Sequence, residues 1–144
     1  MKYHFRIHKE DRGYWAECIE LSGCKTEGDN LEELEANMQE SLNLYLDEPE
    51  TSKIIFPLPQ KISESKNVKA ISVDPNVAFA FVLRRERLLR KLTQKKVADL
   101  LGVGLYSYQR LESSKTANPR FSTIVKLVQV FPRLKSDWIK ALAA

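Results

Sequence analysis

The chain has 144 residues, of which 43% are hydrophobic and 29% are charged, so its composition is that of an ordinary globular protein and excludes wholesale disorder. Two cysteines are too few for a secreted disulfide framework. No apolar run reaches the roughly 18 residues of a membrane span, and the first residues alternate polar and apolar side chains, unlike a signal peptide. We therefore expect a soluble cytoplasmic protein.

The formal charge of +4 conceals an asymmetry between two halves of the chain. Residues 1–74 carry 9 basic and 15 acidic side chains, a net charge of −6, whereas residues 75–144 carry 14 basic and 4 acidic ones, a net charge of +10. This asymmetry predicts two domains, 1–74 and 75–144, with different partners. The acidic half suits a basic protein, and the basic half suits nucleic acid.

The acidic half is predicted to be a small α+β domain. Apolar and polar side chains alternate over several short segments that are separated by turn residues, as in half-buried strands. The expected strands are residues 3–7, 14–19, 24–26 and 68–73. Residues 49–67 contain three prolines and read as an extended connection.

A helix is expected after the third strand. Asn30 is the predicted N-cap, and Glu33 follows three residues later, as in a capping box. Apolar residues then recur at steps of three and four and predict one buried stripe: Leu31, Leu34, Met38, Leu42 and Tyr45. Pro49 marks the end of this helix.

The basic half is predicted to be entirely helical. Pro75 suits the first turn of a helix, where its missing N–H group costs nothing. The expected helices are residues 76–91, 94–101, 105–113, 122–131 and 135–143. Together the two halves predict an α+β protein with a sheet-and-helix domain followed by an all-α domain.

A helix-turn-helix pattern occupies the middle of the basic half. Thr93 caps a short helix, Ala98 is small enough for a close helix crossing, and Gly102 can adopt the left-handed conformation that ends a helix. Three apolar residues are expected to pack the second helix against the first: Val103, Tyr108 and Leu111. Four residues remain for its outer face, which enters the DNA major groove in this motif: Leu105, Tyr106, Gln109 and Arg110.

Residues 79–131 resemble the lambda-repressor-like (Cro/cI, or xenobiotic-response-element) family of DNA-binding domains. The chain departs from that family at Gly104, where a Ser or Thr cap is commoner, and at Tyr108, where Val or Ile is usual. The resemblance implies that Gln94 touches phosphate and that residues of the second helix read bases. The alternative is a bundle of five helices whose charges are only solvated.

Base contacts follow from the chemistry of the outer face. Gln109 can pair with adenine and Arg110 with guanine, or either can bind phosphate, and Tyr106 can meet a thymine methyl group or the backbone. We expect further contacts from Lys95 and Asn118. The last helix has an apolar edge that is either core or a dimer seam: Trp138, Ile139 and Leu142. A homodimer, or a higher homo-oligomer through this domain, is expected because one recognition helix reads few bases.

The acidic half resembles the HicB antitoxin family. The resemblance rests on residues 13–18 and 21–34, with the pattern Leu-x-Gly-Cys…Gly-Asp-x-Leu-Glu-Glu, and on the later sequence Phe56-Pro57-Leu58-Pro59. It covers residues 1–73, and a lambda-repressor-like module commonly follows in that family. It implies a partially preserved ribonuclease-H-like fold that binds and inhibits HicA, a small basic RNA-cleaving toxin, while the second domain represses the operon.

The expected toxin contacts are an aromatic side chain, which suits an interface centre, and acidic side chains of the helix: Trp15, Glu32, Glu33 and Glu35. We expect no enzymatic activity, because Glu17 and Glu20 are too few strand carboxylates for a two-metal site. Cys18 and Cys24 lack zinc-site spacing and are expected to be buried thiols, so no metal or cofactor is predicted. Two alternatives stay open: a stand-alone regulator whose first domain senses a ligand or oligomerises, and a weak metal-dependent nuclease.

Overall fold

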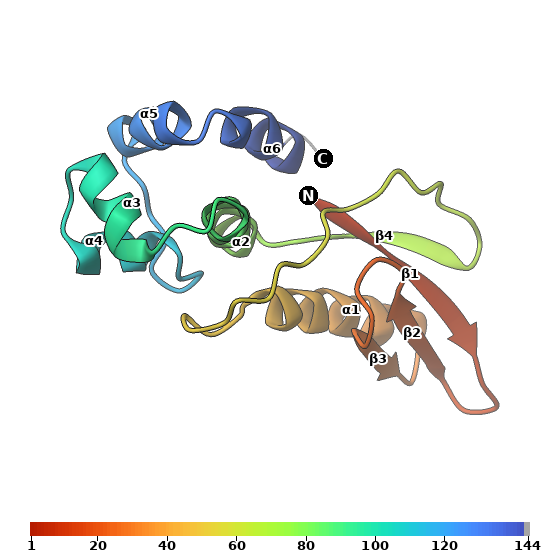
Figure 1. The fold of residues 1–144 in the computed structure, drawn as a ribbon. Coiled ribbons are helices and arrows are strands. Elements are labelled where there is room, and N and C mark those ends of the chain that lie inside the picture. The colour runs from red at the N-terminus through yellow and green to blue at the C-terminus, as the bar shows by residue number, and fades with distance from the viewer. Residues whose placement is uncertain (143–144) are drawn as a thin grey trace. The chain divides into compact units, whose positions relative to one another are not determined.

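The computed structural model describes residues 1–142, including all side chains except those of residues 137 and 139–142. The described chain divides into two compact units, a sheet with one helix and a group of helices, whose elements are labelled in Figure 1. Met1–Leu46 and Phe56–Val73 form the first unit. The second contains Asp47–Ile55 and the chain from Asp74 onward.

The segment Asp47–Ile55, which we call the strap, therefore groups with the helices. In sequence it lies between two parts of the sheet unit, directly after the helix of that unit. The predicted domains, 1–74 and 75–144, assign the strap to the sheet domain instead. Charge and proline content identified it only as a connection, because they carry no information about which unit a connection packs against.

The first unit is a four-stranded antiparallel sheet with one helix. Its elements are β1 (Lys2–Lys9), β2 (Tyr14–Cys18), β3 (Lys25–Gly28), α1 (Leu31–Leu46) and β4 (Val68–Ser72). The strand order β3-β2-β1-β4 places β1, the longest strand, between two partners. Together with the helices of the second unit, this arrangement confirms the predicted α+β class.

Alternation along the strands gives the sheet two chemically different faces. Tyr3, Phe5 and Ala16 are fully buried on one face, which packs against the buried side of α1. His8 pairs with Trp15 across β1 and β2, so both lie on the other face. Their rings stack with centroids 4.0 Å apart, and the ammonium of Lys25 lies 5.9 Å from the Trp15 ring.

The helix α1 begins at its predicted cap. The Asn30 side chain accepts a hydrogen bond from the Glu33 N–H at 2.9 Å, and the Glu33 carboxylate accepts one from the Asp29 N–H at 2.9 Å. The buried stripe is Leu34, Met38, Leu42 and Leu46. The prediction was wrong for Leu31, the first residue of the helix, which is 53% exposed. Tyr45 is only half-buried, and its hydroxyl donates a hydrogen bond to the Ser22 carbonyl at 2.5 Å.

A buried polar cluster closes the sheet unit at one end. The Glu20 carboxylate accepts hydrogen bonds from the His4 backbone N–H at 2.9 Å and from the Gln60 N–H at 3.4 Å, and it pairs with His4 Nδ1 at 2.7 Å. His4 is therefore buried, and it does not share the exposure of Arg6 on the same strand. These bonds attach the segment around Gln60 to the sheet.

Five helices lie in the described part of the second unit. They are α2 (Pro75–Leu89), α3 (Gln94–Leu101), α4 (Leu105–Leu111), α5 (Phe121–Val130) and α6 (Arg133–Leu142). Trp138 of α6 is 7% exposed and stacks on Phe79 of α2 with centroids 4.8 Å apart, so Trp138 belongs to the core. The side chains of Ile139 and Leu142, the rest of the predicted apolar edge, lie outside the described residues. No helix in the described chain is both long and apolar enough to span a membrane.

Candidate nucleic-acid interface

The helices α3 and α4 and the tight turn between them form the predicted motif. The Thr93 hydroxyl caps α3 by accepting a hydrogen bond from the Lys96 N–H at 3.1 Å. Gly102 ends α3 with φ 67° and ψ 34°, a left-handed conformation that disfavours side chains. Ala98 is fully buried, and so is Tyr108 of α4. These local signals fix the crossing of the two helices.

The outer face of α4 is open to solvent, as the sequence predicted. Leu105 is 38% exposed and Tyr106 is 72% exposed. Arg110 is also exposed, and its guanidinium lies 5.9 Å from the centroid of the Tyr106 ring. A cation, an aromatic ring and an aliphatic side chain thus share one face of a short helix, on the half of the chain whose net charge is +10.

A buried network holds the other side of α4. Glu112 immediately follows α4 and has a side chain that is 3% exposed. The Arg87 guanidinium of α2 donates two hydrogen bonds to its carboxylate, at 2.6 and 2.9 Å. Tyr108 donates a third bond, at 2.5 Å. The bidentate ion pair between Arg87 and Glu112, together with the hydrogen bond from Tyr108, joins α2 to α4.

The network shifts the acid–base equilibria of its members. Burial raises the pKa of the Tyr108 hydroxyl, and the neighbouring Glu112 charge raises it further. Burial alone would lower the pKa of Arg87, but the hydrogen bond and charge of Glu112 outweigh this effect and raise it. The phenol therefore stays protonated and the guanidinium stays charged, which keeps the carboxylate fully partnered.

The network extends outward to two residues that were predicted to contact DNA. The Gln94 amide donates to Glu112 at 3.0 Å, and the Gln109 amide donates to the Gln94 oxygen at 3.2 Å. Both glutamines are half-buried. Gln109 is thus engaged with α3, whereas Arg110 and Tyr106 are more exposed on the outer face.

The remaining predicted DNA contacts lie in the first turn of α3 and in the loop before α5. Lys95, in the first turn of α3, is exposed and forms an ion pair with Asp99 four residues later. Asn118 is exposed in the loop before α5. The structure therefore presents both side chains to solvent, Lys95 beside Gln94 in sequence and Asn118 on a separate loop.

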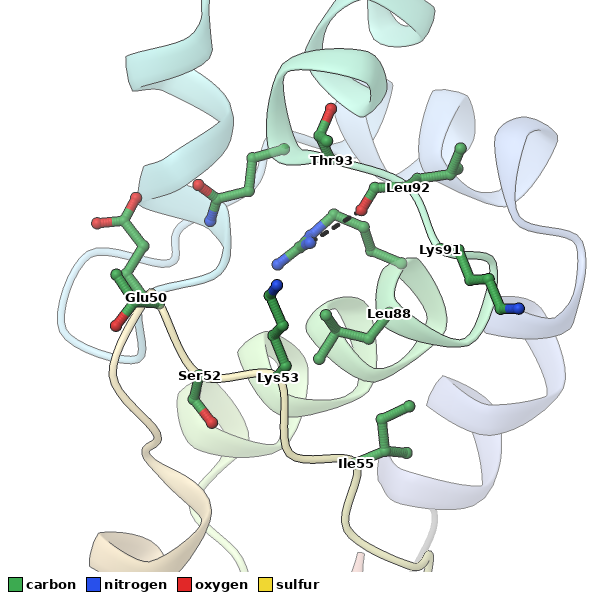
Figure 2. Close-up of a pocket in the computed structure, with 11 residues that line it drawn as sticks. Glu50, Ser52, Lys53, Ile55, Leu88, Lys91, Leu92 and Thr93 are labelled. Carbon is green, nitrogen blue, oxygen red and sulfur yellow. Dashed lines mark hydrogen bonds between the residues drawn. The ribbon is translucent and has the colours of Figure 1, made fainter.

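A cavity of about 500 Å³ opens between the strap and the start of α3. Thr93 and Gln94 line it from the α3 side, and Glu50 and Lys53 line it from the strap. Figure 2 shows Lys53 directed into this space and Lys91 directed away from it. The cavity matters because Gln94 is a predicted phosphate contact.

The predicted toxin contacts of the first unit lie on two different surfaces. Glu32 and Glu35 are exposed on α1, and Glu35 forms an ion pair with Lys69 of β4. Glu33 is exposed but is used in the helix cap. Trp15 lies on the sheet face away from the buried side of α1, where it is half-buried against His8. One flat contact cannot cover Trp15 and the glutamates together.

Both cysteines are free and buried. Burial raises the pKa of the Cys18 thiol to about 12 and also raises the pKa of Cys24, so neither is an activated nucleophile at neutral pH. Among the described residues, no three His, Cys, Asp or Glu side chains are grouped so that they could hold a metal ion.

Sequence reasoning missed the partners Arg87 and Glu112. They are separated by 25 residues and have no common helical or strand periodicity. The unusual Tyr at position 108 was the available signal, because a buried hydroxyl needs a hydrogen-bond partner. The charged residue four positions later, Glu112, supplies that partner.

Comparison with known protein families supports the identification of α3, the turn and α4 as a helix-turn-helix motif. No curated protein matches the chain. Residues 83–139 match the family model described as helix-turn-helix, a range that begins four residues later and ends eight residues later than the resemblance drawn from the sequence. The match includes α3, the turn and α4. This part of the chain is therefore a helix-turn-helix domain of the lambda-repressor-like type, as found in DNA-binding transcription regulators.

Proposed function

We propose that this chain is a HicB-like antitoxin: its helical unit binds operator DNA and represses transcription, and its sheet unit binds and blocks a basic RNA-cleaving toxin of the HicA type. The exposed face of α4 carries the DNA-binding half of this proposal. Leu105, Tyr106 and Arg110 are presented there by a helix whose opposite side is buried.

In this proposal Arg110 and Tyr106 read base edges, since a guanidinium pairs with guanine and an aromatic or apolar group meets a thymine methyl group. Lys95 and Asn118 contact the DNA backbone. Gln94 contacts phosphate while its amide remains bonded to Glu112, and Gln109 supports Gln94. A homodimer supplies two recognition helices to two half-sites.

The toxin-binding half rests on charge and on the resemblance to HicB. Residues 1–74 carry a net charge of −6, and the sheet unit without the strap and Asp74 has 8 basic and 11 acidic side chains, a net charge of −3. This charge favours association with a basic partner. Glu32 and Glu35 are available on α1, so we propose α1 as the main contact and the Trp15 face as a second, separate one. In this proposal the unit has the partially preserved ribonuclease-H-like fold of that family and acts by binding, without catalysis.

The DNA-binding half is tested with DNA from upstream of the gene. Arg110→Ala should cost about 1–3 kcal/mol of binding free energy on the cognate site and relax its sequence preference. Lys95→Ala should weaken binding to all sequences alike, and it should lower the slope of the salt dependence by the amount expected for about one phosphate contact. Lys9→Ala, in the sheet unit, is the charge-matched control and should change neither. Binding that does not depend on salt would contradict the proposed backbone contacts.

The toxin-binding half is tested by co-expression with a neighbouring gene that encodes a small basic protein. We expect the two proteins to co-purify and this chain to restore growth arrested by its partner. The double variant Glu32→Lys/Glu35→Lys should mainly slow association, because exposed charges steer encounters more than they hold complexes. Lys66→Glu/Lys61→Glu serves as a charge-changing control at exposed positions outside α1. Failure to co-purify or to rescue growth would favour a stand-alone regulator.

A further inference from the structure

The strap occupies the side of the helical unit where DNA phosphate is expected. It lines the cavity of about 500 Å³ with Thr93 and Gln94, at the start of α3. It also lines a second cavity, of about 140 Å³, with Gln109 and Arg84. Gln94 therefore lines the larger cavity and Gln109 lines the smaller one. In both cavities, residues of the strap form the opposite wall.

The strap presents carboxylates to this surface. Asp47, Glu48 and Glu50 all line the smaller cavity, and the Asp47 carboxylate accepts a hydrogen bond from the Ser114 hydroxyl at 2.8 Å. Lys53 is the single basic residue of the strap. The segment thus places three acidic groups beside residues that would otherwise meet the negatively charged DNA backbone.

A buried cation lies beneath these carboxylates. Arg84 is 4% exposed, and its Nε atom has no hydrogen-bond partner among the described residues. Burial lowers the pKa of Arg84, and the charges of Glu48, Glu112 and Asp47 oppose this lowering. The strap acids therefore stabilise a guanidinium that is incompletely paired within the unit.

The strap is held weakly enough to be displaced. None of its nine residues is buried, and Ile54 and Ile55 are 54% and 42% exposed. An exposed hydrogen bond joins Asp47 to Ser114, and bonds of this kind contribute only about 1 kcal/mol. Segments with few buried apolar contacts open at low free-energy cost.

We infer that the strap is an autoinhibitory segment whose carboxylates compete with DNA phosphate for the side of the helix-turn-helix domain formed by Gln94, Gln109 and Arg84. This inference rests on the proposed DNA binding. A phosphate that approaches Gln94 and Gln109 meets Glu50 at the larger cavity and Asp47 and Glu48 at the smaller one. These three carboxylates outnumber Lys53, the one basic residue of the strap, so the strap as a whole repels the phosphate. DNA therefore binds only to molecules in which the strap has moved away.

The test compares full-length variants on a labelled random-sequence DNA duplex at low salt, because competition for phosphate does not depend on sequence. The strap variant is Asp47→Asn/Glu48→Gln/Glu50→Gln, which keeps the size of each side chain. The matched control is Asp11→Asn/Glu27→Gln/Glu40→Gln, which makes the same charge change at exposed positions of the sheet unit. Thermal unfolding of each variant checks that both remain folded.

We expect the strap variant to bind DNA about tenfold more tightly than the parent chain. A change of this size results when the fraction of molecules whose strap has moved away rises from about a tenth to nearly all. The slope of its log affinity against log salt concentration should steepen by the amount expected for about one phosphate contact. The affinity of the control should stay within about twofold of that of the parent chain. Equal tightening of both variants would overturn the inference and leave DNA binding intact. Binding by the strap variant alone would support it, whereas no binding by any of the three proteins would overturn the proposed function and the inference together.

Discussion

Each unit of the molecule contains a deeply buried glutamate that accepts several hydrogen bonds, and these two glutamates differ in what surrounds them. The Glu20 side chain in the sheet unit is 0% exposed, and the Glu112 side chain in the helical unit is 3% exposed. Glu20 is bonded to His4 and to the backbone of Gln60. Glu112 is bonded to Arg87, Tyr108 and Gln94.

The difference lies in where each network ends. The bonds of Glu20 attach a connecting segment to the sheet and remain inside the unit. The bonds of Glu112 continue through Gln94 to Gln109, on the side where DNA is expected. The same arrangement, a buried carboxylate with several donors, therefore fixes a loop in one unit and orients two glutamines that we propose lie beside DNA in the other.

The largest expected effect is the loss of Glu112. Glu112→Ala should lower the free energy of unfolding of the helical unit by about 3–5 kcal/mol, because it leaves the buried Arg87 without its counter-charge. Trp138 belongs to this unit and Trp15 to the other, and the chain has two tryptophans. Denaturation followed by fluorescence in a Trp15→Phe background therefore reports the helical unit alone.

Two further variants make that measurement specific. Asp99→Ala removes an exposed partner of Lys95 and should cost no more than about 1 kcal/mol. The double variant Arg87→Met/Glu112→Leu should recover much of the loss, since apolar replacements of a buried pair are often tolerated. If Glu112→Ala costs no more than Asp99→Ala, the buried pair does not stabilise this unit.

The second expected effect is the loss of Glu20, and it should be smaller. Glu20→Ala should lower the free energy of unfolding of the sheet unit by about 1–3 kcal/mol, the cost of unpaired buried donors. The partner of Glu112 is a guanidinium, which cannot be deprotonated and therefore keeps an unpaired buried charge when the carboxylate is lost. The measurement uses a Trp138→Phe background, and a cost equal to that of Glu112→Ala would remove this distinction.

The last two expected effects concern glycines, and the smallest of all is at Gly102. A Cβ atom at Gly28 would lie 2.6 Å from the backbone N of Leu34, so Gly28→Ala should cost the sheet unit about 1–3 kcal/mol through overpacking. Gly102 has space for a Cβ atom but a φ of 67°, so Gly102→Ala should cost the helical unit about 1 kcal/mol. Thermal unfolding of both variants checks the order, and a greater cost at Gly102 would contradict it.

Local signals in the sequence were sufficient for much of the fold. The caps at Asn30 and Thr93 and the left-handed Gly102 were all predicted, because each depends on residues within a few positions of one another. The exposed face of α4 followed from the same local pattern. The exposure of Leu31 did not, since a helical stripe predicts a direction and does not say where the opposing sheet ends.

Long-range contacts were not predictable in this way. The pairing of Arg87 with Glu112 joins segments that are 25 residues apart, and the strap packs with helices that follow it in sequence. Trp15 and the glutamates of α1 were predicted together as toxin contacts only because their side-chain chemistry suits an interface. Strand alternation places Trp15 on the face away from the buried side of α1, as its pairing with His8 shows.

The strap also bears on how much protein is needed to occupy a site. A segment that must move aside before any DNA binds raises the apparent Kd for every sequence by the same factor. The ratio between the affinities for the operator and for random genomic DNA is then unchanged. What changes is the protein concentration needed to occupy a site. Weak genomic sites are then occupied even less, and the proposed operator is occupied only at a higher concentration of the chain. Asp47, Glu48 and Glu50 would thus set the threshold of regulation without taking part in the choice of sequence.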